Sequence, residues 1–428
     1  MNAAAVADVP DTSRVMDRRA RQARKAVVFV TYNGVLDPLG TSQMLSYLER
    51  LNRTYRVHIL SFERPDKLAD EVRVRAMERR LADQDIGWVH LRYHSRPSLP
   101  ATTYDMLSGV VALRRLIARE GVGLVHARGY LPMEIASNAS RTVPMLFDIR
   151  GLQAEEYVDG GVWKEGELKW RLAKRSERRF FRRAAGAVVL TKSIRPYVAG
   201  RFGELRGDAP PIAVIPCCVD LERFRFAEDA RTRIRAELGV TDDTTVFVYS
   251  GSLGTWYLSQ DMARFVRAYQ KDTGKKVFLL WLVNNDEEIA RRATAAAGLG
   301  EGEHALRSAT PDQVPAWLSA ADVGLALIKP CFSKRSSSPT KYAEYLSVGL
   351  PIVISRDVGD GAEVERAEGA VALGEKIDDA ELTRAARALA SLVLRGREHF
   401  RSVAEHLFDV EKVALPVYLG LYEKLVHR

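Results

Sequence analysis

Cysteine is scarce in this sequence, with three residues among 428. Cys217 and Cys218 are adjacent, Cys331 stands alone, and no C-x-x-C or Cys/His spacing occurs. We therefore expect neither a disulfide framework nor a zinc site, and the pattern is typical of a protein from a reducing cytoplasm.

Long apolar runs are also missing. No stretch of about 18 consecutive apolar residues occurs, so we expect no membrane-spanning helix. The first 25 residues lack an apolar core and are rich in Ala and Arg, so we interpret residues 1–25 as a disordered basic tail rather than a secretory signal. The prediction is a cytoplasmic protein, with peripheral attachment to the inner face of the membrane left open.

The rest of the composition is that of a folded protein. Hydrophobic residues make up 46% and charged residues 28%, and 428 residues correspond to two or three domains of roughly 150 residues each. The net charge is +9, from 64 Lys+Arg against 55 Asp+Glu. This excess indicates either an anionic partner or an Arg-rich, solvated surface.

Strand-like and helix-like segments alternate along the chain from Ala26 onward. Short apolar runs such as 26–32 and 244–251 predict buried strands, and most are followed by a helical pattern. Such alternation predicts parallel strands with crossover helices. A Gly/Pro-rich stretch, GELRGDAPP, falls near the middle. We therefore predict an α/β protein with two Rossmann-like, doubly wound domains, 26–210 and 211–405, that face across a cleft.

The most informative segment is SSSPTKYAEYLSVGLPIVIS, residues 336–355. A helix is predicted to begin at Pro339, and its free N–H groups and dipole would attract an anion. Glu344, about one turn further on, can accept hydrogen bonds from two ribose hydroxyls. The alternative is an ordinary capped helix. The candidate phosphate ligands of this segment are Ser337, Ser338, Thr340 and Lys341.

The segment resembles the family 4 glycosyltransferases, whose signature is a Glu-x7-Glu pair before a Gly-x-Pro-Val step. Glu344 matches the second Glu, and Gly349 begins the matching step. The first Glu, which contacts the donor sugar in the family, would fall at Ser336, so the signature is incomplete. Further segments resemble the family at 32–43 (YNGVLDPLGTSQ), 147–151 (FDIRG), 215–224 (IPCCVDLERF) and 249–257 (YSGSLGTWY).

This resemblance implies the GT-B architecture, with 26–210 as acceptor domain, 211–405 as nucleotide-sugar donor domain and a C-terminal helix at 406–428 that packs back on the first domain. It implies a retaining glycosyltransferase, of the kind used in polysaccharide biosynthesis. Such an enzyme moves a sugar from a nucleotide-diphosphate sugar to a hydroxyl of a carbohydrate, lipid-linked or small-molecule acceptor. Neither a metal ion nor a separate cofactor is expected.

The departing diphosphate needs fixed positive charge and hydrogen-bond donors. Many family members carry an Arg and a Lys just after the first strand of the donor domain. This chain has GSLGTW at 251–256, which contains neither, although Ser252 stays a candidate ligand. We therefore expect the cation to come from the loop 329–341, with Lys334 and Arg335 as candidates. The alternative is that both are solvated surface residues.

In the first domain, the candidates lie in a Gly-containing loop and at one strand end. Gly34 and Gly40 permit close approach of the backbone to the donor. Asp37 is a candidate for orienting the acceptor hydroxyl, or else a turn residue. Asp148 and Arg150 are candidate catalytic residues at the carboxyl end of a strand, or else an ion pair that holds the loop.

The segment 163–186 is strongly basic, with nine Lys/Arg and three Glu between 164 and 183. As an amphipathic helix it can lie on anionic lipid, or its Trp and Phe residues can pack on the sheet. Two other functions stay open: another GT-B enzyme such as a nucleotide-sugar epimerase, or a non-catalytic module that binds anions or nucleic acid. A nucleic-acid partner is not expected, because no RNP, helix-turn-helix or zinc-finger pattern occurs.

Overall fold

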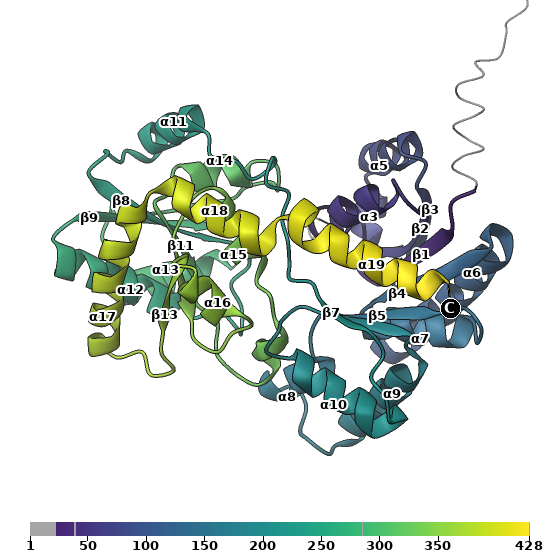
Figure 1. The fold of residues 1–428 in the computed structure, drawn as a ribbon. Coiled ribbons are helices and arrows are strands. Elements are labelled where there is room, and N and C mark those ends of the chain that lie inside the picture. The colour runs from purple at the N-terminus through teal and green to yellow at the C-terminus, as the bar shows by residue number, and fades with distance from the viewer. Residues whose placement is uncertain (1–22, 38–39, 285, 428) are drawn as a thin grey trace, which may run out of the picture.

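The computed structural model describes residues 23–37, 40–284 and 286–427, which form two parallel sheets, each covered by helices (Figure 1). The tail predicted at 1–25 lies outside the described residues except for 23–25. The two doubly wound sheets confirm the predicted architecture.

The first sheet has seven strands in the order β3-β2-β1-β4-β5-β6-β7. They are β1 (Ala26–Thr31), β2 (Arg56–Glu63), β3 (Gly87–Arg92), β4 (Val122–Arg128), β5 (Met145–Ile149), β6 (Gly186–Val189) and β7 (Ile212–Val214). Apolar runs such as AVVFVT form central strands here because helices bury both faces of the sheet.

Four helices cover one face of this sheet: α6 (Ser98–Glu120), α7 (Tyr130–Ala139), α9 (Leu168–Arg183) and α10 (Arg195–Arg206). The other face is covered by α3 (Ser46–Leu51), α5 (Glu71–Asp83) and the C-terminal helix α19 (Leu415–Val426). Two shorter helices, α4 (Pro65–Leu68) and α8 (Gln153–Asp159), lie in connections.

The second sheet has six strands in the order β10-β9-β8-β11-β12-β13. They are β8 (Thr244–Ser250), β9 (Lys276–Leu282), β10 (His304–Arg307), β11 (Val323–Ala326), β12 (Ile352–Ser355) and β13 (Ala370–Leu373). One face packs against α14 (Val314–Ser319), α15 (Thr340–Ser347), α16 (Gly361–Arg366) and α18 (Arg397–Phe408), and the other against α12 (Ser259–Thr273), α13 (Glu287–Ala296) and α17 (Asp379–Leu392). The helix α11 (Glu228–Leu238) precedes β8.

The C-terminal helix crosses from the second domain back to the first, as predicted. In Figure 1 the yellow helix α19 follows α18 and lies over the first sheet near β4. Tyr418, Tyr422 and Leu425 of α19 are buried in the core of the first domain. The Tyr422 hydroxyl hydrogen-bonds His126 Nδ1 of β4 at 2.6 Å. The last turns of the chain thus complete the first domain.

The prediction of a helix over the basic segment 163–186 is wrong at its ends, since α9 spans Leu168–Arg183. Gly161 and Gly166 have φ of +72° and +82°, and a helix cannot continue through left-handed positions. The helices α8, α11 and α16 were not predicted from the sequence. They are short or polar, so their apolar periodicity is weak.

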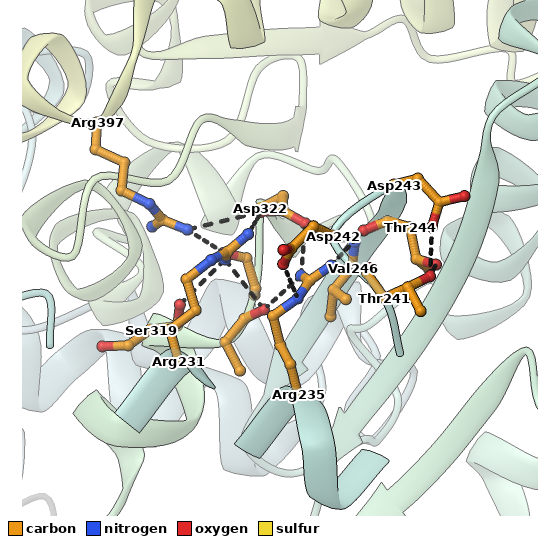
Figure 2. Close-up of polar contacts among 12 residues, drawn as sticks. Arg231, Arg235, Thr241, Asp242, Asp243, Thr244, Val246, Ser319, Asp322 and Arg397 are labelled. Carbon is orange, nitrogen blue, oxygen red and sulfur yellow. Dashed lines mark hydrogen bonds and ion pairs between the residues drawn. The ribbon is translucent and has the colours of Figure 1, made fainter. Parts of the chain in front are cut away.

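In the second domain, three arginines surround the carboxylate of Asp322 near the amino ends of the strands (Figure 2). Asp322 Oδ2 accepts hydrogen bonds from Val246 N at 2.9 Å and Arg235 Nη1 at 3.1 Å, and Oδ1 accepts from Arg231 Nη2 at 2.8 Å. Arg397 Nη2 lies 3.7 Å from Oδ1. Burial and the neighbouring Arg231 lower the pKa of Arg397 to about 10. Asp322 therefore links α11, α18 and β8.

Replacing Asp322 with Asn keeps the side-chain shape but removes the only negative charge shared by these arginines. We expect the free energy of unfolding to fall by about 2–4 kcal/mol, because partly buried guanidinium groups lose their counter-charge. Urea denaturation measures this. The matched control is Glu288→Gln, which removes an exposed i,i+4 pair with Arg292 and should change stability by less than about 0.5 kcal/mol. Equal effects of the two substitutions would contradict the prediction.

Candidate functional site

The carboxyl ends of both sheets border a cleft that holds adjoining cavities. One, the second-domain cavity, has a volume of about 390 Å³ and is lined only by residues of the second half of the chain. The other, the interdomain cavity, has about 260 Å³ and is lined from both halves. Tyr257 and Thr340 line both cavities, so the two are continuous.

A larger cavity, of about 670 Å³, lies elsewhere, near the amino ends of the second sheet beside Thr244, Lys276 and Asp322. Doubly wound sheets bind their ligands outside the carboxyl ends of the strands. The larger cavity is also lined by Asp322 and Arg397, which belong to the charged cluster that links α11, α18 and β8. We therefore place the functional site in the cleft.

Lys341, in the first turn of α15, is the central cation of the second-domain cavity. Its side chain is buried, and its ammonium nitrogen lies 4.6 Å from the ring centre of Tyr257 and 5.1 Å from that of Tyr249. Among the described residues it forms no ion pair. A Cβ on Gly251, whose φ is +124°, would lie 2.9 Å from this nitrogen, so the loop after β8 approaches Lys341 closely because residue 251 is Gly.

Glu344 stands one turn after Thr340 and lines the second-domain cavity. Its carboxylate has no hydrogen bond or ion pair with another described residue. Burial raises its pKa above the ordinary value, although Lys341 and Arg223 oppose the shift. A half-buried carboxylate that faces a cavity can accept hydrogen bonds from a ligand. Ser252 lines the same cavity, where its carbonyl accepts a hydrogen bond from the Tyr249 hydroxyl at 2.6 Å.

The start of α15 also faces the interdomain cavity, through Ser337, Ser338 and Thr340. Ser338 Oγ accepts a hydrogen bond from Cys217 N at 3.0 Å, which ties this loop to the segment that follows β7. The structure therefore brings together all four predicted phosphate ligands of the motif at one helix end, with Glu344 beside them.

The predicted cations Lys334 and Arg335 are placed differently. Lys334 lines the interdomain cavity, but its ammonium pairs with Glu156 of α8 at 3.1 Å and lies 4.0 Å from the ring centre of Trp256. Arg335 is exposed and lines neither cavity, while its carbonyl accepts hydrogen bonds from Thr191 and Ser193. Lys334 is therefore paired with a carboxylate, and Arg335 lies outside both cavities. Within the predicted loop 329–341, Lys341 is the lysine that lines a cavity without a carboxylate partner among the described residues, and the supply of the cation from this loop stays a prediction.

Asp148 and Arg150 lie at the carboxyl end of β5 and form a buried cluster with Arg128 and His126 of β4. Asp148 is 1% exposed, and its oxygens lie 3.6 Å from Arg128 Nη1, 3.6 Å from Arg150 Nη1 and 3.4 Å from His126 Nε2. Burial opposes ionisation of Asp148, but Arg150 and His126 outweigh it and lower its pKa to about 2. Burial lowers the pKa of His126, so this imidazole is neutral near pH 7.

Arg128 and Arg150 both line the interdomain cavity, whereas Asp148 lies beneath them. The sequence pointed to Asp148 and Arg150 but did not assign a role to Arg128. The signal that would have found it is strand register, because Arg128 pairs directly with Asp148 in the parallel ladder.

Gly34 and Gly40 are needed for a tight loop rather than for contact with a described cavity. A Cβ on Gly34 would collide with the carboxylate of Glu63, and one on Gly40 would collide with the carbonyl of Gly34. Asp37 is half-buried and lines neither cavity. Its carboxylate oxygen Oδ2 lies 3.8 Å from Arg64 Nε, and its backbone N–H donates a hydrogen bond to the Gly34 carbonyl at 3.3 Å. This geometry matches the turn interpretation of Asp37.

Glu63, which the sequence analysis missed, organises this loop from the end of β2. It is fully buried and accepts hydrogen bonds from Val35 N at 2.7 Å and Leu36 N at 3.1 Å. The only signal in the sequence is a Glu at the end of a short, mostly apolar segment, VHILSF. Its partners are about 27 residues away in the chain, so periodicity cannot find them.

Along one edge of the cleft the two domains are joined by hydrogen bonds. Lys192 N and Ser193 N donate to the carboxylate of Asp360 at 2.6 and 3.1 Å, and Ser333 N donates to Asp159 Oδ2 at 2.8 Å. These contacts hold the segment before α15 against the first domain.

Two further findings concern the described residues only. No group of three or more His, Cys, Asp or Glu side chains among them could hold a metal ion. No described helix is long and apolar enough to cross a membrane.

Comparison with known proteins finds a family model that matches part of the chain and solved structures that share its fold. Residues 41–223 match the model of Glycosyltransferase Family 4. No curated protein matches the chain by sequence. A glycosyltransferase from Rickettsia africae ESF-5 is similar in structure, with 12% identity, a TM-score of 0.68, and 94% of this chain and 99% of that chain covered.

Two more solved structures are similar to this chain. Sucrose-phosphate synthase from Thermosynechococcus elongatus has 16% identity and a TM-score of 0.66, covering 94% of this chain and 100% of that chain. Anabaena Alr3699/HepE in complex with UDP-glucose has 14% identity and a TM-score of 0.64, covering 93% of this chain and 99% of that chain. These likenesses confirm the GT-B fold.

Proposed function

We propose that the chain is a family 4 glycosyltransferase that transfers a sugar from a nucleotide-diphosphate sugar to a hydroxyl group of an acceptor. The match of residues 41–223 to the family model and the GT-B fold support this proposal. The observation that carries the proposal is the buried ammonium of Lys341, which has no carboxylate partner among the described residues and lies beside Glu344 at the start of α15.

The diphosphate of the donor fits the start of α15. The first N–H groups of a helix have no partner within the helix, and the dipole places partial positive charge there. Lys341 adds a full charge, and Ser337, Ser338 and Thr340 add hydroxyl groups. These groups would stabilise the negative charge that develops on the diphosphate as the glycosidic bond breaks. Because the Lys341 side chain is buried, this attraction is stronger than at an exposed site.

Glu344 would hold the ribose through two hydroxyl hydrogen bonds, and the sugar would extend into the interdomain cavity, where the acceptor enters. The bound UDP-glucose of HepE supports a nucleotide sugar as the donor class. Retention of the anomeric configuration and independence from a metal ion are parts of this proposal, and they rest on the resemblance to the family. No separate cofactor is proposed.

Glu344→Ala tests the donor site. Thermal unfolding is measured with UDP-, GDP-, ADP- and dTDP-glucose, and a donor at about 100 times its dissociation constant should stabilise the protein by roughly 2.7 kcal/mol. We expect E344A to lose the shift produced by the best donor, because the ribose hydroxyls lose their acceptor.

The control for this experiment is Glu375→Ala, an exposed carboxylate of the same domain, which should keep the shift. An E344A variant with full donor affinity would show that the nucleoside binds elsewhere. Acceptor-dependent formation of a glycosylated product separates a transferase from a nucleotide-sugar epimerase, which needs no acceptor.

The pH dependence of donor binding tests the same carboxylate. Burial raises the pKa of Glu344, so its ionised form is lost at a higher pH than for an exposed Glu. Protonation removes an acceptor for the ribose, and donor affinity should therefore fall as the pH is lowered through this raised pKa, while Glu344→Gln flattens this part of the profile. Calorimetric titration across about pH 5 to 8 measures both.

The contribution of Glu344 to the stability of the free protein should change with pH in the direction opposite to that of donor affinity. The folded-state pKa of Glu344 is above its unfolded value, so its contribution to stability is present at low pH and is lost as the pH rises through the folded pKa. Identical pH profiles of binding for wild type and E344Q would contradict the assignment.

We also propose peripheral contact with anionic lipid through α9 and the loop before it. Phe180 and Phe181 are buried in the core, so these aromatic residues of the basic segment pack on the sheet. Leu168 and Leu172, one turn apart, are 72% and 56% exposed among Lys and Arg side chains. An exposed apolar pair flanked by positive charge fits a membrane surface, and a lipid-linked acceptor would be reached there.

Co-flotation with vesicles of phosphatidylcholine, with or without phosphatidylglycerol, tests this contact. We expect binding only to the anionic vesicles and a several-fold loss of bound protein in the Leu168→Gln/Leu172→Gln double variant, because both the apolar area and the charge contribute. Leu394→Gln, at an 82% exposed leucine of the second domain, is the control. Equal binding of all variants, or no binding of the wild type, would refute the proposal.

A further inference from the structure

We propose that Arg128 and Arg150 form a second anion site, on the first-domain wall of the interdomain cavity, and that this site takes a phosphate group carried by the acceptor. The inference rests on the proposed function, because it assigns a substrate class to the acceptor half of the same cleft.

The charges of the cluster do not balance. Two guanidinium groups share one carboxylate, Asp148, and neither forms an ion pair with any other described residue. The Asp148 oxygens lie 3.6 Å from both groups, which is longer than an ordinary hydrogen bond. His126, the fourth member, is neutral near pH 7. One positive charge is therefore left over at the cavity wall.

The two arginines also have hydrogen-bond donors that other protein groups do not fully use. Arg128 Nε is buried without a hydrogen-bond partner among the described residues. Arg150 Nη2 donates only to the Cys217 thiol, at 3.2 Å, which is a weak and uncharged acceptor. The two side chains are 12% and 17% exposed, so they are held in place but still reach the cavity. Paired guanidinium groups match the geometry of a phosphate.

Neighbouring strands and the helix α19 support the cluster and keep the guanidinium groups of Arg128 and Arg150 in position. Arg128 ends β4 and Arg150 follows β5, and these strands are neighbours in the sheet. Under them, Tyr418 of α19 packs against His126 with ring centres 5.6 Å apart, and Tyr422 hydrogen-bonds the same imidazole. Strand ends and a packed helix give a rigid site rather than two mobile surface arginines.

The arginines belong to the first domain, whereas the proposed donor phosphate ligands belong to the second. Lys341 and Glu344 line the second-domain cavity, and Arg128 and Arg150 line the interdomain cavity, which Ser337 and Ser338 also line. A donor on α15 and a phosphate on the arginines would therefore be held by different domains of one cleft. The acceptor hydroxyl would lie between them, close to the sugar that is transferred.

Inorganic phosphate is the probe for this site. Calorimetric titration is performed on the full chain saturated with the nucleotide sugar that gives the largest shift in the donor screen. We expect phosphate still to bind, and Arg128→Gln to weaken that binding about tenfold or more, because a charge-assisted contact is lost. Lys341→Met should lose nucleotide-sugar affinity and keep the phosphate bound at the arginines. Arg233→Gln, at an exposed arginine of α11, should change neither.

Arg150→Gln should weaken phosphate binding as Arg128→Gln does. The double variant Asp148→Asn/Arg150→Gln removes opposite charges together, and serves if the single variant does not fold. With the nucleotide absent, phosphate binding to Lys341→Met is still measurable, so failure of the donor assignment and failure of this site give different results.

Two outcomes would overturn the proposal. In one, R128Q binds phosphate as well as wild type does. In the other, the nucleotide sugar displaces phosphate and R128Q loses nucleotide affinity as K341M does, which would place the donor phosphates on the arginines. Faster transfer to phosphorylated than to unphosphorylated sugars by the wild type, with the preference lost in R128Q, would support it.

Discussion

A buried ammonium group without a carboxylate partner is the constraint on which the site depends. Removing a charge from water is unfavourable unless other groups compensate for it. Lys341 obtains part of that compensation from the faces of Tyr249 and Tyr257. The rest is left for an anionic ligand. Gly251 lets the loop after β8 approach the ammonium closely, so the positive charge is held at the cavity by the fold itself.

Charge elsewhere in the cleft is arranged so that most positive groups are already neutralised. Lys334 pairs with Glu156 and Lys192 pairs with Glu363 across the two domains, and Arg223 of the second-domain cavity pairs with Asp312. Among the described residues that line the two cavities, Lys341 and the Arg128–Arg150 pair keep positive charge that no carboxylate balances. The two proposed anion sites thus lie on different domains, one for each substrate.

The C-terminal helix connects the two halves in a second way. By crossing from α18 to the first sheet, α19 places Tyr418 and Tyr422 under the strand ends that carry the arginines. The support of the first-domain site therefore comes from the last residues of the chain, which follow the second domain in sequence.

The sequence by itself determined the alternation of buried strands and helices, and with it two parallel sheets whose carboxyl ends would face a cleft. It also located the helix on which the donor proposal rests, because Pro339, the Ser/Thr run, Lys341 and Glu344 are local in the chain and lie at one helix end. Periodicity and helix capping depend on residues that are close in the chain, so they can be recognised in the sequence without knowledge of the fold.

Only the tertiary structure decided which cations are free. Lys334 and Arg335 looked equivalent to Lys341 in sequence, but one is paired with Glu156 and the other points to solvent. Likewise, Glu63 binds the loop at Val35, and Arg128 meets Asp148 and the α19 tyrosines, through contacts between distant segments. Whether a charged side chain serves a ligand or a neighbour depends on what the fold brings beside it, and that information is not local.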